Sequence, residues 1–276
     1  MIAALVRSEY RKIVSTRGWW GLLIPVVLLS LLINAFGGLI GSFADAASGG
    51  EVALPLLLAS LAYTLALTAS FAAVSGAVGA AGEFRHGTIT TTYLTAPGRG
   101  PVLVAKMLTA GAVGVVYALG ATAFGLIGGL VGQGDSPFPA IGSLLSVVGI
   151  GVAVCALWSA IGVALASALA NQVGVLVTLL VYVLLGELLL SLLLGASESG
   201  PVQQITAYLP VNAGEVALYE LPAIAIAGPP VGRDVAGAVA GVTGPLPWWI
   251  SLLVLAAWAV AAAAVAWWAT ARRDIT

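Results

Sequence analysis

Charged residues are scarce in this sequence. Asp, Glu, Lys and Arg together make up 8% of the chain, whereas soluble domains carry roughly 25%. Hydrophobic residues make up 61%, and the mean hydropathy is +1.10. So few charges cannot cover a water-facing surface. The composition therefore excludes an ordinary soluble domain and predicts a protein of the lipid bilayer.

Cysteine and histidine occur once each. Cys155 lies in an apolar run without a partner for a disulfide or a metal site, so we expect a small packing residue. His86 lies in a polar loop, which excludes a His-rich metal centre and a serine protease with a membrane histidine. The motifs H-E-x-x-H and G-x-x-x-x-G-K-[ST] are absent. The sequence therefore predicts no catalytic site, metal or bound cofactor, and a net charge of -1 without a basic block predicts no nucleic-acid partner.

Six apolar runs long enough to cross a bilayer follow one another along the chain. They cover residues 19–40, 54–81, 102–131, 141–169, 173–194 and 248–270. The first is about 22 residues long, against roughly 7–15 for the apolar part of a signal peptide, so we expect an anchor and not a cleaved signal. The predicted fold class is an all-α integral membrane protein, with one transmembrane domain over residues 1–276.

The leader, residues 1–17, has the pattern of an amphipathic helix. Apolar residues recur at three- and four-residue spacing, with basic residues on the other side. The apolar set is Ile2, Leu5, Val6, Tyr10 and Ile13, and the basic set is Arg7, Arg11 and Lys12. We expect this helix to lie in the headgroup plane of the membrane. The alternative is an ordinary basic flank that only orients the first span.

Lys and Arg are distributed unevenly between the two ends that six spans create. Nine of the ten fall on the side of the N-terminus, namely Arg7, Arg11, Lys12, Arg17, Arg85, Arg99, Lys106, Arg272 and Arg273. Only Arg233, in the long segment 195–247, falls on the other side. Because cytoplasmic loops carry the excess of Lys and Arg, both termini are predicted to be cytoplasmic. Richness in Ala, Gly and Val and the preference for Arg over Lys suggest a bacterial cytoplasmic membrane.

The most polar internal segment is 82–101, GEFRHGTITTTYLTAPGRGP, between the second and third spans. A short helix that either begins near Gly87 or continues one begun at Glu83 would end at Pro97 and its flanking glycines. Its face would offer a small apolar knob to a partner's groove, formed by Phe84, Ile89 and Tyr93. The alternative is that the charges of this segment are only a solvated basic flank.

Two polar residues lie within the predicted spans. Glu187 is in the middle of the fifth span, where a charged acid costs roughly 2.5–3.5 kcal/mol on insertion scales. It predicts a proton relay or a substrate-path group, or else a neutral acid hydrogen-bonded between helices or lying near the outer headgroups. Asn34 is a candidate for the same path or for a hydrogen bond between helices. Charges in the outer segment are expected to be solvated, with a gate or an ion pair as the alternative: Glu215, Glu220, Arg233 and Asp234.

At the central segment the sequence resembles the membrane subunit of type-2 ABC exporters. In that family a glutamate follows the second span, then a Gly-Thr pair, a run to a proline and an arginine, and a lysine that opens the third span. The corresponding residues are Glu83, Gly87, Thr88, Leu94, Pro97, Arg99 and Lys106. The leader is similar through Glu9, Lys12 and Ser15-Thr16-Arg17, and the outer segment through Tyr208-Leu209-Pro210. The resemblance covers the topology of the whole chain and is motif-specific mainly in the leader and the central segment.

The resemblance implies that residues 82–101 form a cytoplasmic coupling helix, seated in a groove of a soluble ABC ATPase subunit. Two permease chains, identical or homologous, would pair around the substrate path above two ATPase subunits, which bind ATP and Mg. Segment 195–247 would fold back as re-entrant helices that gate the outer end. The implied coupling residues are Glu83, Phe84, Arg85, His86, Gly87, Thr88, Ile89, Tyr93, Pro97 and Arg99.

The predicted function is therefore efflux driven by ATP hydrolysis in a partner, and not catalysis by this chain. The alternative is a secondary transporter that uses an ion gradient through Glu187. That class would require further intramembrane carboxylates and an internal repeat, and the two halves of the sequence show no clear similarity. A purely structural role is a third interpretation.

Overall fold

The computed structural model describes residues 2–47, 56–132 and 138–273, which form helices joined by short turns. The α-helices are α1 (Ile2–Ser15), α2 (Gly18–Ala47), α3 (Leu56–Arg85), α4 (Thr88–Thr95), α5 (Arg99–Gly132), α6 (Ile141–Leu169), α7 (Gln172–Val181), α8 (Glu187–Gly195), α9 (Gly200–Gln204), α10 (Pro210–Ala227), α11 (Val231–Val239) and α12 (Trp248–Arg272). Two further turns interrupt them: the π-helical turn η1 (Tyr182–Gly186) and the 3₁₀ turn η2 (Ile205–Tyr208).

Six helical stretches of the described chain are long and apolar enough to cross a membrane. They are Gly18–Gly41, Leu56–Arg85, Arg99–Gly132, Ile141–Leu169, Gln172–Gly195 and Trp248–Arg272. Each one coincides with one of the six predicted apolar runs, and the ends differ by a few residues. The prediction of an all-helical chain with six such helices is confirmed, and its architecture is that of a multi-pass membrane protein.

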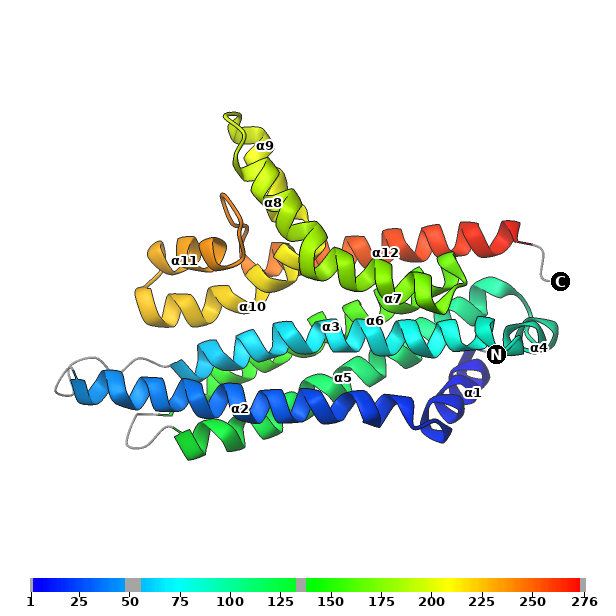
Figure 1. Cartoon of the computed structure of the whole chain (residues 1–276), viewed down its shortest axis with the longest axis horizontal. Coiled ribbons are helices and arrows are strands. Elements are labelled where there is room, and N and C mark those ends of the chain that lie inside the picture. Colours follow the sequence, from blue (N-terminus) through cyan, green and yellow to red (C-terminus); the bar gives the residue numbers. More distant parts are fainter. Residues whose placement is uncertain (1, 48–55, 133–137, 274–276) are drawn as a thin grey trace.

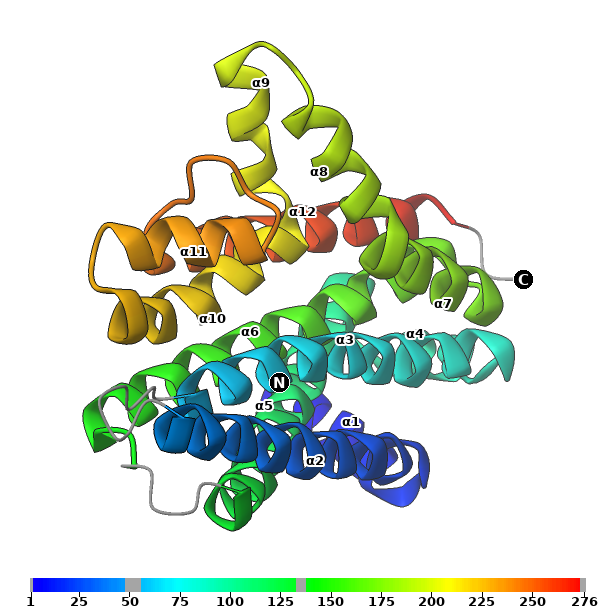
Figure 2. The same cartoon turned by 60° about the vertical axis from the view of Figure 1, so that its left-hand side comes forward.

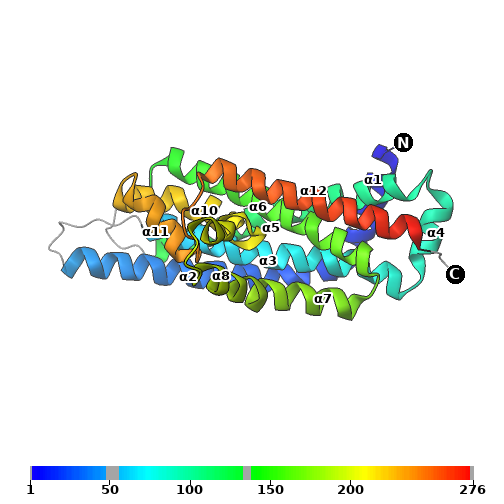
Figure 3. The same cartoon turned by 90° about the horizontal axis from the view of Figure 1, so that it is seen from above.

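Helices α3, α5 and α6 form the interior of the bundle (Figure 1). Of the most apolar part of each helix, 56% is buried in α3 and 50% in α5, against 22% in α2 and in α12. Helices α7 and α12 lie along the outside of this group (Figure 3). The interior helices are rich in Ala, Gly and Ser, while the outer ones expose Leu, Val and Trp side chains suited to contact with lipid.

Glycines allow these helices to approach at backbone distance. A Cβ on Gly162 of α6 would lie 2.0 Å from the carbonyl oxygen of Ala73 in α3. Equivalent contacts join α5 to α2, where a Cβ on Gly128 would lie 2.2 Å from the Leu31 carbonyl oxygen. Lipid tails give helices no hydrophobic reason to associate, so such close van der Waals packing is what holds the interior together.

One end of the bundle holds both chain termini together with α4 (Figure 1). Helix α1 crosses this end at a steep angle to the long axis of the bundle, while α11 lies at the opposite end. Among the described residues, every Lys and Arg except Arg233 belongs to this end, which we call the basic end. The structure thus brings together the leader, the central segment and the tail, as the sequence predicts for six spans.

The fifth span is not the single straight helix that residues 173–194 suggested. It is divided into α7, the π-helical turn η1 and α8, and at η1 the chain leaves the bundle, so that α8 and α9 project sideways (Figures 1 and 2). Helix α10 then returns to pack on α3, α6 and α12. A π-turn shifts the register of a helix by one residue and thereby redirects its faces. Segment 195–247 is accordingly helical, through α9, η2, α10 and α11.

The contact between α3 and α6 can be tested with Gly162→Ala. The added methyl meets a backbone carbonyl, so the two helices must separate, and we expect a loss of roughly 1–3 kcal/mol of stability. Gly149→Ala in the same helix is the matched control, because a Cβ there meets nothing within 4 Å. Thermal unfolding in detergent measures both. Equal melting temperatures for the two variants would contradict the packing described.

Candidate functional site

Four helices meet in a cluster of ion pairs at the basic end. Lys106 of α5 contacts Glu9 of α1, with 2.8 Å between Nζ and Oε2, and also contacts Oε1 of Glu83 at the end of α3. Lys12 of α1 lies 2.6 Å from Glu9 and 3.1 Å from Glu83. The Lys12 ammonium also donates to the Thr92 hydroxyl of α4, over 3.1 Å. The cluster therefore joins α1 and α4 to the interior helices.

This cluster is electrically balanced, with two carboxylates and two ammonium groups. The side chain of Lys106 is 6% exposed and that of Glu9 is 8% exposed, so each depends on the other for its stability away from water. Burial lowers the pKa of Lys12, but its hydrogen bonds with Glu9 and the charges of Glu83 and Glu9 outweigh burial, and the net pKa is raised. The stabilisation from Lys12 is thus present at neutral pH and is lost only as the pH rises through this raised pKa.

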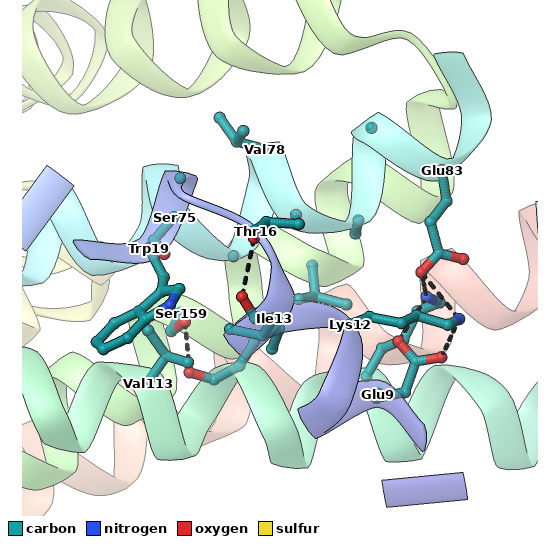
Figure 4. Close-up of a pocket in the computed structure, with 18 of the residues that line it drawn as sticks. Glu9, Lys12, Ile13, Thr16, Trp19, Ser75, Val78, Glu83, Val113 and Ser159 are labelled. Atoms are coloured by element: carbon teal, nitrogen blue, oxygen red, sulfur yellow. Dashed lines mark hydrogen bonds and ion pairs between the residues drawn. The ribbon is translucent and has the colours of Figure 1, made fainter. Parts of the chain in front are cut away.

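A cavity of about 490 Å³ lies beside the cluster, beneath α1 and between α2, α3, α5 and α6. Figure 4 shows Glu9, Lys12 and Glu83 at one side and the indole ring of Trp19 at the other. The Trp19 Nε1 atom is buried and has no hydrogen-bond acceptor among the described residues. The cluster therefore forms a wall of an internal space, so a displacement of α4 or α1 would change the shape of that space.

The central segment is also tied to the C-terminal tail. Arg99, at the start of α5, donates through Nη1 to the carbonyl oxygen of Thr270 and, over 2.8 Å, to that of Arg273. Its guanidinium lies 5.6 Å from the ring centroid of Tyr93 in α4. Arg273 in turn donates to the Ala168 carbonyl oxygen over 2.8 Å. Helix α4 is thereby linked to the ends of α12 and α6.

A further link runs to the fifth span. Arg85, the last residue of α3, donates from Nη1 to the Oε1 atom of Gln172 over 3.2 Å. Gln172 begins α7, directly after the tight turn in which the Asn171 side chain caps Gly174. Asn171 therefore stabilises the turn between α6 and α7. The central segment therefore contacts α1, α5, α7 and α12.

The local structure of the central segment follows from its sequence. Helix α3 continues to Arg85 and α5 begins at Arg99, so the connection is shorter than the predicted 82–101. Gly87 has φ 68°, a left-handed conformation that favours glycine, and it separates α3 from α4. Ala96 is extended before Pro97, as the residue before a proline prefers, and it ends α4.

The predicted apolar knob is wrong in its orientation. Ile89 is 4% exposed and faces the bundle, while Phe84 and Tyr93 are only half-buried. The apolar side chain that α4 presents to solvent is Leu94, which is 82% exposed. The helix period explains the difference, because Ile89 and Tyr93 share the face that contacts the bundle, and Leu94 lies outside it. Beside Leu94, the exposed residues of this region are Arg85, His86, Gly87, Thr88, Thr91, Thr95 and Pro97.

Glu187 has a structural partner that the sequence did not indicate. Its two carboxylate oxygens accept the backbone N–H groups of Val211, over 3.0 Å, and Asn212, over 2.7 Å. These are unpaired donors in the first turn of α10, and a carboxylate there is favoured both by hydrogen bonding and by the helix dipole. The Asn212 side chain donates to the Ser191 hydroxyl over 2.8 Å. Glu187 therefore fastens α8 to α10.

Asn34 is fully buried between α2 and α3. Its amide donates to the Thr64 hydroxyl over 3.1 Å and accepts from the Ser60 hydroxyl over 2.9 Å. These bonds are those of a residue that joins two helices, which was one of the two interpretations of the sequence. Cys155 is likewise buried in the core, as expected of a packing residue.

Charges in the outer segment were expected to be solvated, and for Glu220 this expectation is wrong. Glu220 is 1% exposed and accepts from Nε of Arg233 over 2.8 Å and from the backbone N–H of Trp248. The pair joins α10 to α11 and to the start of α12. Asp234 is exposed, as predicted, whereas Glu215 is half-buried. The alternative of an ion pair is the one that applies to Glu220 and Arg233.

The sequence did not indicate that the four residues of the ion-pair cluster meet in space. Glu9, Lys12, Glu83 and Lys106 all belong to the family pattern, but their sequence separations, up to 97 residues, gave no sign that they meet. The contributions of Thr92, Gln172 and Arg273 were missed. The available signal was that all of them lie in or next to the Lys- and Arg-rich segments, which six apolar runs place at one end of the bundle.

No protein-family model matches the chain, and no curated protein matches it. Its class therefore follows from the structure alone, as an all-helical chain with six helices long and apolar enough to cross a membrane.

Removal of Lys106 tests the cluster. Lys106→Met leaves Glu9 and Glu83 with one ammonium between them, and breaking a buried pair costs about 3–5 kcal/mol, so we expect a large drop in melting temperature in detergent. Glu83→Gln in addition restores the charge balance and should recover part of the loss, as measured by a double-mutant cycle. Arg11→Met, on the exposed side of α1, is the control. A drop no larger than that of the control would refute a structural cluster.

Glu187→Gln tests the fastening of α8 to α10. A glutamine offers one oxygen where two N–H groups need acceptors, so an expected loss of about 1–3 kcal/mol should appear as a lower melting temperature and faster proteolysis of segment 195–247. Glu198→Gln, at an exposed site between α8 and α9, is the control. Unchanged stability combined with lost gradient-driven transport would instead identify Glu187 as a proton relay.

Proposed function

We propose that the chain is the membrane permease subunit of a type-2 ABC exporter and that α4 is its coupling helix. One observation carries the proposal. A short helix between the second and third spans directly follows Glu83, whose ion pairs join the end of α3 to α1 and α5. The Thr92 hydroxyl of this helix accepts a hydrogen bond from Lys12 of the same cluster, and the helix presents an exposed leucine away from the bundle. A solvated basic flank would not require such a cluster. The basic end of the bundle is accordingly the cytoplasmic end.

The proposed mechanism uses α4 as a lever. A soluble ATPase subunit binds the face around Leu94, and closure of two such subunits on ATP displaces α4 and the end of α3. The Glu83–Lys106–Glu9 cluster transmits the displacement to α5 and α1, and the Arg85–Gln172 bond transmits it to α7. A rigid, ion-paired connection suits this role because exposed single contacts are individually weak.

The outer end supports a gate for the exported substrate. Helix α10 is fastened to α8 through Glu187 and to α11 and α12 through Glu220. Movement of the fifth span would therefore move the outer helices as well. In this proposal segment 195–247 is extracytoplasmic, and Asn34 is a packing residue and not part of the path.

The projecting arm of α8 supports pairing with a second permease. Its leucines are exposed, among them Leu188 at 55%, Leu192 at 61% and Leu193 at 73%. An apolar helix that leaves its own bundle requires another apolar surface, which is either lipid or another chain. We propose that the arm contacts a second permease chain, identical or homologous, across the substrate path.

The energy source in this proposal is a partner, because the sequence contains no phosphate-binding G-x-x-x-x-G-K-[ST] loop. ATP and Mg would be bound in the ATPase subunits. An ion-gradient mechanism through Glu187 is the second candidate, but both oxygens of that carboxylate accept backbone N–H groups, which favours a fixed structural carboxylate over a relay.

Leu94→Asp tests the docking face. The side chain makes little contact with the bundle, so the variant should keep the wild-type melting temperature, while a buried charge at the interface should weaken ATPase binding roughly tenfold or more. The measurement is ATP hydrolysis and subunit stoichiometry in permease purified from native membranes in mild detergent. Ser8→Asp, exposed on α1, adds the same charge away from α4 as the control. Absence of any co-purifying ATPase with the wild-type chain, or equal amounts with all three chains, would refute the proposal.

A further inference from the structure

Three acidic residues of the outer half are withdrawn from solvent to different degrees. Glu187 accepts two backbone N–H groups at the N-terminus of α10, and Glu220 is paired with Arg233. Glu215, on α10 between them in the sequence order, is half-buried and has no hydrogen bond or ion pair with any described residue. A carboxylate in a low-dielectric site without a donor is unfavourable, so the chain leaves one negative charge for something else to balance.

Glu215 lines a cavity of about 200 Å³ at the bend of the fifth span. The cavity lies between α3, α6, α10 and the π-helical turn η1, at the level where α8 leaves the bundle (Figures 1 and 2). Its walls include the aromatic rings of Tyr63, Trp158 and Tyr219. Tyr63 is 48% exposed and Leu184, also in the lining, is 64% exposed, so the cavity reaches the surface of the bundle.

The π-turn contributes directly to this space. Val183 and Leu184 of η1 line it, together with Val211 and Gly214 of α10. Single π-turns occur frequently at functional sites, because the extra residue re-aims side chains without ending the helix. The bend of the fifth span and the cavity are therefore parts of one local structure.

The chemistry of the lining selects one class of ligand. Aromatic faces and a carboxylate attract a weakly hydrated organic cation, through cation–π and charge interactions. A divalent metal ion requires several oxygen ligands, and the lining offers a single carboxylate. The volume is below the 300–1,000 Å³ typical of drug-sized pockets, which suits a cationic headgroup rather than a whole drug molecule.

We propose that this cavity binds a small organic ammonium ion, with Glu215 as the counter-ion and Tyr219, Trp158 and Tyr63 as the aromatic wall. The quaternary ammonium headgroup is the class that fits best, because it needs no hydrogen-bond acceptors beyond charge and π faces. The proposal does not depend on an ATPase partner, since it concerns binding to this chain alone.

The proposed site has a definite pH dependence. Burial, and in second place the negative charge of Glu187, raise the pKa of Glu215 to about 7. The carboxylate is neutral below this pKa and charged above it, so cation binding should strengthen as the pH rises from 6 to 8. The other titratable groups near the cavity are Tyr63 of α3, Tyr219 of α10, Tyr182 of η1 and Glu187 of α8; α6 contributes Trp158, which does not titrate.

Calorimetry on the purified full chain in detergent at pH 8 tests the site, with choline as the cation and 3,3-dimethylbutan-1-ol as its neutral isostere. We expect saturable binding of choline, at least roughly tenfold weaker binding of the isostere, and weakening of choline binding at pH 6. These comparisons use the unmodified chain, so they stand even if a variant fails to fold.

Variants then assign the residues. Glu215→Gln should weaken choline binding roughly tenfold or more, while Glu198→Gln, an exposed outer acid, should leave it unchanged. Tyr219→Phe keeps the aromatic face and should retain binding, whereas Tyr219→Leu should weaken it several-fold, by about the strength of a cation–π contact. No saturable choline binding, equal binding of the isostere, or full binding in Glu215→Gln would each overturn the proposal. Because no nucleotide or partner is present, its failure would leave the exporter proposal untouched.

Discussion

A carboxylate that leaves water needs a positive charge or hydrogen-bond donors, and this requirement organises two separate parts of the molecule. At the basic end Glu9 and Glu83 share Lys106 and Lys12, which fixes α1 and α4 against the interior helices. Where α8 leaves the bundle, Glu187 takes the backbone donors of α10. Each carboxylate joins separate helices, so the ion pairs and hydrogen bonds that stabilise its charge also determine tertiary contacts.

Away from these carboxylates, close packing and hydrogen bonds between helices hold the bundle together. Glycines at positions such as Gly128 and Gly162 let helices meet at their backbones, and the buried hydroxyl and amide groups, Asn34 among them, bond to neighbouring helices. The helices therefore pack most closely where α3, α5 and α6 cross, whereas the fifth span, with its π-turn, departs from regular helical packing. In the proposed exporter, such an arrangement would supply a packed core and one element whose position can change relative to it.

Most of the architecture was readable from the sequence, and much of the site was not. The six long apolar helices and the amphipathic leader follow from hydrophobic runs and their periodicity, and the short helix that starts after Gly87 is one of the two forms that the helix signals allowed. The face of α4 was predicted wrongly, because Ile89 reads as an exposed knob in a polar segment but packs inward. Glu220 was expected in solvent because it lies in a segment rich in Pro and Gly, and it is buried against Arg233 instead.

The sequence by itself determined which stretches are long and apolar enough to cross a bilayer and which of their ends carry the Lys and Arg residues, because hydropathy and charge placement are properties of composition along the chain. Only the tertiary structure decided that Lys106 lies between Glu9 and Glu83, that Glu187 caps α10 and that Glu215 faces an aromatic cavity with no hydrogen-bond partner among the described residues. These are contacts between residues distant in sequence. They depend on how helices rotate about their axes and where the fifth span bends, and hydrophobic periodicity in helices that are apolar on all sides does not encode that rotation.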